Sequence, residues 1–338
     1  MKKILVTLAV TLSPACAFAQ VLSLQPGFEQ QTLLSVSAPV GGFDFDSSGN
    51  IFYIGGSTDT QVVEATQASS YGTLTPIVDY NTFTYGSFVT VHGGTVYYGD
   101  SVDGGNVNAS STTAVSPTPG PTPIANMPGN YDLAFSGATA LVSANISGSN
   151  NEVFRLNTTT DKYAELLNTN GDYSGPIAVT ATGELIYGES GLNGSGAADG
   201  GIYIFSAASV ANAISSGIPL QLANAETIIP DSGNSSFTLG PDNQLFQAFS
   251  PYNGGAATLT IYNLTNGNST LIGAADNDGY YFSGMSFFDG DLTVAETDGY
   301  SFTDFIQITE IPEPGAASLG IGGLVLLAAL RRMRSPVL

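Results

Sequence analysis

The chain is poor in the residues that many enzymes use for catalysis and metal binding. Its one cysteine, Cys16, lies within the first 20 residues, so the rest of the chain has no disulfide, thiolate metal site or cysteine nucleophile. It has one histidine, His92, which nearly excludes a histidine-based zinc site. Tryptophan is absent. Carboxylates, hydroxyls and amides are the groups left for chemistry.

Basic residues are also scarce, and most of them lie at the two ends of the chain. Seven lysines and arginines stand against 28 acidic residues, for a net charge of −21. Residues 20–310 contain 27 of the acids but only two basic residues, Arg155 and Lys162. Because so negative a surface repels phosphate groups, we expect no nucleic-acid partner. Neutral sugars, cations and basic proteins remain as partners.

The overall composition favours short strands joined by tight turns. Charged residues make up 10% of the chain, against roughly 25% in an average globular protein. Hydrophobic residues reach 43%, which is too many for a disordered acidic chain, and there are 41 glycines. Glycine together with abundant Asn, Ser and Thr is typical of a protein with many turns between strands.

The first 19 residues have the three parts of a secretory signal peptide. Lys2 and Lys3 supply the positive start, and residues 4–12 form an apolar run. Ala17 and Ala19 form a small-residue cleavage site before Gln20. The sequence therefore predicts removal of residues 1–19 by signal peptidase and export of the rest.

The last 28 residues, 311–338, form a second distinct segment. Pro312, Glu313 and Pro314 precede an apolar stretch at residues 316–330, and a basic cluster of Arg331, Arg332 and Arg334 follows it. As a helix, this stretch would span about 22 Å, which is short against about 30 Å of hydrocarbon. The arginines would stay cytoplasmic. The segment is thus either a plain membrane anchor or a removable tail.

This order of elements closely resembles the PEP-CTERM sorting signal of Gram-negative bacteria. The resemblance implies that Pro312, Glu313 and Pro314 are recognised by an exosortase, a membrane protease, and that the helix is then removed. It also implies transient anchoring in the inner membrane and final location at the cell surface or in an exopolysaccharide matrix. Two prolines around Glu313 keep the chain extended there, as a protease requires.

Residues 20–310 contain one pattern six times: an apolar strand, a turn with Gly or Asp, and a second strand, as in "YDLAFSGATALVSAN". The first apolar residues after the six turns lie 44 to 60 positions apart; they are Ile51, Val96, Leu141, Leu185, Leu245 and Leu292. A period near 45 with short strands is typical of a propeller blade. The copy "DFDSSGNIFYIGG" resembles blades of the NHL and SMP-30-like propellers.

We therefore predict an all-β propeller domain over residues 20–310, with six blades and with seven as the alternative. A β-sandwich or β-solenoid is the competing architecture. The sixth copy lacks a fourth strand, and residues 31–38 fit the gap, so that the two ends of the domain would close the ring. In the long fourth copy, residues 207–215 predict a helix and residues 218–224 the fourth strand.

Carboxylates are the strongest candidates for catalysis, because two of them suffice to cleave a glycosidic bond. Asp44 and Asp46 alternate along the first strand of one copy, and Asp132 begins the equivalent strand of another. First strands line the channel of a propeller, so these three acids are candidates to converge there. The alternative is that they face solvent or cap turns. His92 sits in a glycine turn, where a polar residue is ordinary.

Acidic turns near the end of the domain offer a second type of site. Asp276 and Asp278 precede Gly279, and Asp289 and Asp291 flank Gly290. Oxygen ligands around a glycine suit Ca²⁺, but an Asp-Gly turn needs no metal. Calcium is the one cofactor that the sequence suggests, and no other is expected.

Tyrosines in strands and loops could stack on sugar rings; the candidates are Tyr97, Tyr98, Tyr252, Tyr280, Tyr281 and Tyr300. Three classes of function remain open. The leading one is an exported surface or matrix protein that binds or scaffolds exopolysaccharide. The others are a carbohydrate-active hydrolase or lyase that uses channel carboxylates, and a coat component that self-associates.

Overall fold

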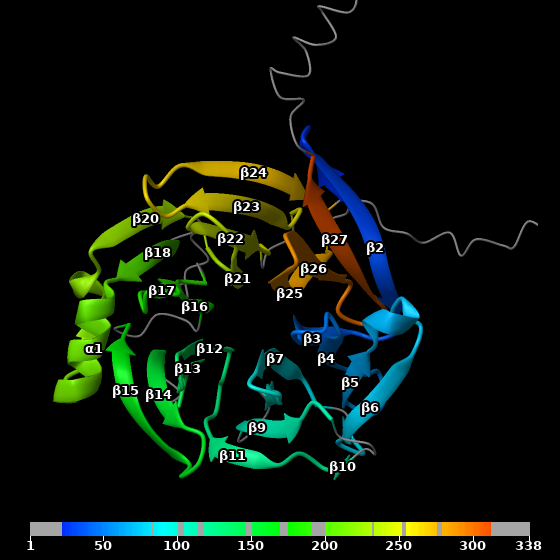
Figure 1. Ribbon diagram of the computed structural model, residues 1–338, viewed down its shortest axis with the longest axis horizontal. Helices are drawn as coiled ribbons and strands as arrows, with labels where there is room; N and C mark the ends of the chain where they lie inside the picture. The colour runs from blue at the N-terminus through cyan, green and yellow to red at the C-terminus, as the bar shows by residue number, and fades with distance from the viewer. Residues whose placement is uncertain are drawn as a thin grey trace, which may run out of the picture.

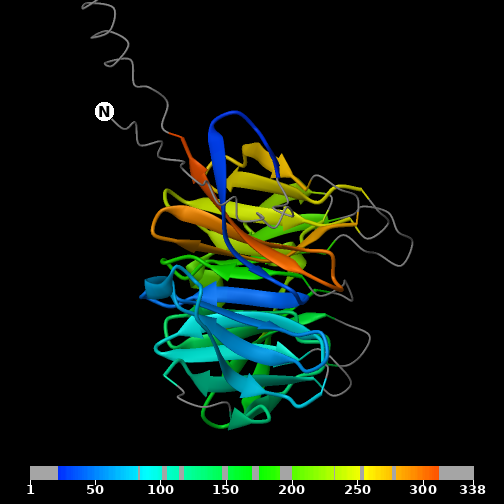
Figure 2. The same ribbon diagram turned by 90° about the vertical axis from the view of Figure 1, so that its right-hand side faces the viewer.

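The computed structural model describes residues 22–82, 84–100, 105–113, 118–146, 151–169, 175–190, 200–231, 233–251, 255–275 and 279–311. These residues form six antiparallel sheets arranged as a ring around a central axis (Figure 1). Figure 2 shows the ring from its edge, with the sheets packed face to face. The predicted six-bladed propeller is therefore confirmed.

Each blade contains four main strands, numbered here from the channel outwards. Blade 1 consists of β3 (Val40–Phe45), β4 (Ile51–Gly55), β5 (Gln61–Ala65) and β6 (Leu74–Asp79). Blade 2 consists of β7 (Gly86–His92), β8 (Thr95–Asp100), β9 (Asn106–Ser111) and β11 (Pro123–Asn126). Blade 3 consists of β12 (Asp132–Ser136), β13 (Thr139–Ala144), β14 (Glu152–Asn157) and β15 (Lys162–Asn168).

The second half of the ring follows the same plan. Blade 4 consists of β16 (Ile177–Val179), β17 (Leu185–Gly188), β18 (Gly200–Phe205) and β20 (Thr227–Asp231). Blade 5 consists of β21 (Ser236–Leu239), β22 (Gln244–Phe249), β23 (Thr258–Asn263) and β24 (Ser269–Ala274). Blade 6 consists of β25 (Tyr281–Phe288), β26 (Asp291–Thr297), β27 (Thr303–Glu310) and β2 (Phe28–Val36).

Three two-residue strands extend the outer edges of blades 5, 1 and 3; they are β1 (Ser23–Leu24), β10 (Thr118–Pro119) and β19 (Leu220–Gln221). Short 3-10 turns occur at Gln67–Ser69 and Leu222–Asn224. One α-helix, α1 (Ala207–Ser216), is present in the described part of the chain and lies on the outer side of the ring beside β15 (Figure 1).

The hydrophobic core is divided into layers between neighbouring blades. The six repeated apolar residues named above all lie on the second strands, and each is at most 2% exposed. One apolar cluster fills the space between each neighbouring pair of blades. Each blade therefore depends on both neighbours to bury its two faces.

Pairing between the two ends of the domain closes the ring. The N-terminal strand β2 runs antiparallel to β27, from Phe28 opposite Glu310 to Val36 opposite Thr303. The Ser35 hydroxyl also donates to an Asp304 carboxylate oxygen at 2.5 Å. The predicted closing strand is thus confirmed, with its bounds shifted from 31–38 to Phe28–Val36. It removes the exposed edge that β27 would otherwise present.

The fourth strand of blade 4 lies further along the chain than predicted. Helix α1 was expected; Ser206 caps its start by accepting from the Ser209 amide at 3.3 Å, and Gly217 ends it at a φ of 71°. After α1 the chain runs to the edge of blade 3, where β19 pairs in parallel with β15. The prediction of a blade 4 strand at residues 218–224 is therefore wrong. The strand that pairs with β18 is β20.

Glycines let the inner strands of blades 1 and 2 approach each other closely. A Cβ on Gly41 would lie 2.0 Å from the Gly86 carbonyl oxygen, and one on Gly42 would lie 2.8 Å from the Cα of Phe88. No side chain fits at these positions without moving the backbone. This close approach brings the channel ends of β3 and β7 together.

Several of the predicted sorting residues lie outside the described residues. These are Ala17, Ala19, Gln20, Pro312, Glu313, Pro314, Arg331, Arg332 and Arg334. The same holds for the apolar stretch 316–330. Within the described ranges, no helix is long and apolar enough to cross a membrane.

Removing β2 tests the role of ring closure. Deletion of Phe28–Val36 leaves β27 unpaired and exposes the apolar layer between blades 6 and 1. We expect the free energy of unfolding to fall by about 5 kcal/mol or more and the protein to self-associate through the free edge. Urea denaturation and light scattering measure the two effects. Replacing Ser23 and Leu24 of β1 by glycine is the control. A monomeric deletion variant of unchanged stability would contradict this account.

Candidate functional site

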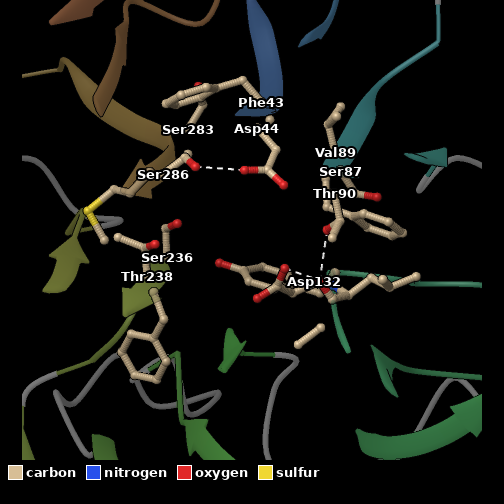
Figure 3. Close-up of a pocket in the computed structure, with 18 of the residues that line it drawn as sticks. Phe43, Asp44, Ser87, Val89, Thr90, Asp132, Ser236, Thr238, Ser283 and Ser286 are labelled. Atoms are coloured by element: carbon tan, nitrogen blue, oxygen red, sulfur yellow. Dashed lines mark hydrogen bonds between the residues drawn. The ribbon is translucent and has the colours of Figure 1, made fainter. Parts of the chain in front are cut away.

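The centre of the ring contains a cavity of about 480 Å³. It is lined by the inner strands of all six blades, which bring together segments from Val40 to Ser286 (Figure 3). The lining residues lie mainly toward the beginnings of these strands. The cavity therefore opens toward the end of the channel where the chain enters each blade.

Hydroxyl groups are the most frequent polar groups on the wall of this cavity. They belong to Ser87, Thr90, Ser236, Thr238, Ser283 and Ser286, among others (Figure 3). Among the described residues that line the cavity, none is basic. Apolar surface from Phe43, Val89 and Met285 lies between the hydroxyls. Such a wall suits a ligand that is rich in hydroxyl groups and carries no negative charge.

Asp44 lies on β3 and connects three blades. One carboxylate oxygen accepts from the Phe45 amide at 2.8 Å and from the Ser286 hydroxyl of blade 6 at 2.6 Å. The other accepts from the Val91 amide of blade 2 at 2.8 Å. Burial raises the pKa of Asp44 despite these hydrogen bonds, which favour the charged form. The carboxyl group faces the cavity (Figure 3).

Asp132 repeats the arrangement on β12 of blade 3. Its carboxylate oxygens accept from the Leu133 amide at 2.8 Å and from the Ile177 amide of blade 4 at 2.9 Å. Burial raises its pKa to about 7; the two amides oppose this change and the nearby charge of Asp44 adds to it. Asp44 and Asp132 thus each bind the backbone of the next blade, and both line the cavity.

Asp46, the third predicted acid, has a different place. It follows β3 and is not among the cavity-lining residues. Its carboxylate accepts from the Ser48 and Asn50 amides at 2.8 and 2.9 Å, which stabilises the turn into β4. Of the three acids, the structure brings Asp44 and Asp132 to the cavity and leaves Asp46 in a turn.

Further hydrogen bonds across the channel come from residues that sequence reasoning did not single out. The Thr90 hydroxyl donates to the Leu133 carbonyl at 2.8 Å, from blade 2 to blade 3. The Tyr131 hydroxyl donates to the Ser235 carbonyl at 2.8 Å, next to blade 5. The position of Tyr131 directly before Asp132 was the available signal. Which groups Tyr131 and Thr90 reach depends on the ring.

Three tyrosines gather at one side of the cavity. Tyr281 lines the cavity and is 38% exposed, whereas Tyr300 and Tyr85 are 86% and 62% exposed. Burial raises the pKa of Tyr281, and the nearby Asp298, Tyr300 and Tyr85 add to this effect. Their influence on Tyr281 places these groups close together. We call Tyr85, Tyr281 and Tyr300 the tyrosine rim.

Asp298 holds the loop that carries Tyr300. Its carboxylate accepts from the amides of Tyr300 and Ser301 at 2.9 and 2.8 Å, and from the Ser301 hydroxyl. Partial burial opposes the charged form, but these hydrogen bonds prevail and lower the pKa of Asp298 to about 2. The loop therefore presents the Tyr300 ring from an anchored backbone.

The other candidate tyrosines have other surroundings. Tyr98 is fully buried, so it offers no exposed ring. Tyr97 packs on Phe135 with ring centres 5.1 Å apart, and Tyr280 on Phe302 at 5.5 Å. Tyr252 lies outside the described residues.

The acidic turn at Asp289 is a β-hairpin between β25 and β26. Asp289 and Gly290 have φ angles of 50° and 96°, as a two-residue turn with positive φ at both positions requires. Asp291 accepts from the Gln307 side chain at 2.7 Å. Asp276 and Asp278 lie outside the described residues. Within the described part of the chain, no three His, Cys, Asp or Glu side chains are grouped to hold a metal ion.

His92 lies in the hairpin between β7 and β8, away from the cavity. Its exposed ring stacks on Phe135, with centres 3.9 Å apart and planes at 8°. It is not among the cavity-lining residues. The structure therefore places it as a packing residue beside blade 3.

The sequence matches no protein-family model and no curated protein. Similar folds occur among solved structures. A structural genomics protein of unknown function from Bacteroides thetaiotaomicron is 11% identical, with 82% of this chain and 72% of that chain covered and a TM-score of 0.55. A chain of the mitotic checkpoint complex is 12% identical, with 90% and 99% covered and a TM-score of 0.50. The WD40 propeller domain of Doa1 is 12% identical, with 85% and 97% covered and a TM-score of 0.49. At these identities, the likeness concerns the fold alone.

Replacing Asp44 and Asp46 in turn tests whether Asp44 links the blades. Asp44→Ala leaves the Val91 amide of blade 2 and the Ser286 hydroxyl of blade 6 without their acceptor. We expect a loss of about 3 kcal/mol in the free energy of unfolding for Asp44→Ala. For Asp46→Ala, whose partners lie in one turn, we expect about 1 kcal/mol. Urea denaturation of both variants decides, and equal losses would refute the inter-blade role.

Proposed function

We propose that this protein is exported and binds a neutral glycan segment at the central cavity, with exopolysaccharide as its source. The observation that carries the proposal is the pairing of a hydroxyl-lined cavity with the tyrosine rim at one side. Hydroxyls and backbone groups can exchange hydrogen bonds with sugar hydroxyls, and tyrosine rings can stack on the apolar faces of sugar rings.

Size and charge support a neutral ligand. A volume of about 480 Å³ lies within the usual range for small-molecule sites. The cavity contains two carboxyl groups and, among its described lining residues, no base. Since 27 acids surround it in residues 20–310, an anionic ligand would meet repulsion both at long range and in the cavity.

Binding is favoured over catalysis by what Asp44 and Asp132 already contact. Asp44 accepts three hydrogen bonds and Asp132 two, all from the propeller itself. A nucleophile or general base needs a free lone pair directed at the substrate. These acids instead hold neighbouring blades together.

Glycoside hydrolysis is the second candidate function, and one observation favours it. Two carboxyl groups face the same cavity, and the pKa of Asp132 is raised to about 7. A general acid with such a pKa can protonate a leaving oxygen near neutral pH. In this mechanism, Asp44 would serve as the second carboxylate.

Co-sedimentation of the full chain with exopolysaccharide from the producing organism tests the proposal. Neutral oligosaccharides released from the same polymer serve as soluble probes for calorimetry. We expect Tyr300→Ala to weaken binding about tenfold, which corresponds to about 1.4 kcal/mol for a lost stacking contact. Ile228→Ala, an exposed apolar change on the outer strand β20, should leave affinity unchanged.

Other outcomes of this experiment separate the alternatives. Release of oligosaccharide that stops in Asp132→Asn would establish hydrolysis instead of binding alone. Loss of binding in chelator would point to a calcium site at the acidic turns. Equal binding by Tyr300→Ala and the parent protein would remove the tyrosine rim from the proposal.

We further propose that residues 311–338 act as an exosortase-recognised sorting tail. The last ring contact of the chain is the Ile311 amide, which donates to the Gly27 carbonyl at 2.8 Å. Ile311 is 45% exposed, and Pro312 follows it directly. A protease can therefore reach the motif without opening the propeller.

The mass of the exported protein tests the sorting tail. In the producing bacterium we expect the released protein to lack residues 1–19 and the apolar stretch 316–330. Glu313→Ala should keep the tail and stay with the membrane fraction, whereas Glu310→Ala, at the end of β27, should be processed normally. Release of the protein with residues 316–330 intact would refute the proposal.

A further inference from the structure

The two basic residues of the propeller lie together in a second pocket. Arg155 and Lys162 both line a cavity of about 490 Å³ on the outer part of blade 3. In the sheet, Arg155 pairs with Ala164 and Asn157 pairs with Lys162. Arg155 and Lys162 are thus diagonal neighbours on one face of the sheet, a relation that separates side chains by about 7–8 Å.

Neither of these cations is neutralised by an acid. Within the described part of the chain, neither Arg155 nor Lys162 takes part in an ion pair. This is unexpected, because residues 20–310 contain 27 acidic residues and only these two basic ones. Two like charges on one sheet face repel each other, and a bound anion would offset that repulsion.

Arg155 is held in place by helix α1. One guanidinium nitrogen donates to the Ile214 carbonyl in the last turn of the helix at 2.6 Å. This contact is favourable, because a cation lies at the negative end of the helix dipole. It uses one of the five N–H donors of the side chain. Arg155 is half-buried and Lys162 is exposed, so the pair combines one fixed and one adaptable cation.

Polar side chains surround the two cations. Thr139, Asn157, Thr158 and Thr159 line the same pocket, together with Tyr163, whose side chain is 40% exposed. Hydroxyl and amide groups are the partners that sugar hydroxyls need. A simple inorganic anion would use the two cations and leave these groups without a role.

We propose that this pocket binds a sugar carrying one carboxylate, of the uronic acid class. The carboxylate would contact Arg155 and Lys162, and the ring hydroxyls would contact the threonines and Asn157. A single negative charge fits better than a polyanion, because the surrounding acids repel extended negative chains. This site is separate from the central cavity, so the inference does not depend on the proposed function.

Calorimetric titration of the full chain with D-glucuronate tests this site. We expect saturable binding of glucuronate, with no binding of glucose at the pocket and weaker binding of inorganic sulfate. Lys162→Gln, which keeps most of the side-chain length, should weaken glucuronate binding about tenfold through loss of a charge-assisted hydrogen bond. Lys162→Arg should retain affinity.

Asp161→Asn is the matched control. Asp161 is exposed in the same turn and has a φ of 55°, which asparagine tolerates. Removing its negative charge should leave glucuronate affinity equal or slightly higher. The unfolding curves of these variants should overlap that of the parent chain, because both changes lie on the surface.

Several results would overturn the inference. These are no binding of glucuronate, equal binding by Lys162→Gln, and equal affinity for sulfate and glucuronate, which would mean a bare anion site. Tighter binding of an oligoglutamate peptide than of glucuronate would favour an acidic protein partner instead. Binding of neutral oligosaccharide at the central cavity should be the same in all of these variants, so the two sites are tested separately.

Discussion

The pairing of β2 with β27 is the contact on which the rest of the molecule depends. Each blade buries its faces only against its neighbours, and the apolar clusters lie between blades. An open chain of blades would leave an apolar face at each end and a free strand edge at β27. Because the first strand joins the last blade, every blade gains two neighbours and the inner strands are held around one channel.

Closure also decides what the channel carboxylates can do. Asp44 and Asp132 accept backbone amides from the next blade, so the same groups that form the cavity wall hold the blades together. Burial raises the pKa of both acids, while their hydrogen bonds occupy the oxygens that chemistry would need. A propeller can therefore present acids in its channel for structural reasons, and their convergence alone does not identify an enzyme.

The ring contains two polar environments of opposite character. The central cavity combines hydroxyls with two acids, and the pocket beside α1 combines hydroxyls with Arg155 and Lys162. Their separation lets one protein contact neutral and singly acidic sugars in different places, which suits a protein that lies within a mixed polysaccharide. The high net negative charge limits both sites to ligands of low negative charge.

The sequence by itself determined the number of blades, the apolar position after each turn and the strand that closes the ring, since these follow from local alternation and turn residues repeated six times. It also indicated α1. It did not determine which acid reaches the channel: Asp44 and Asp46 are two residues apart, yet only Asp44 lines the cavity, because the strand ends between them. Nor did it reveal that residues 218–224 leave blade 4 or that Arg155 and Lys162 share a pocket. These depend on register and on contacts between blades, which join residues far apart in the chain and which only the tertiary structure decides.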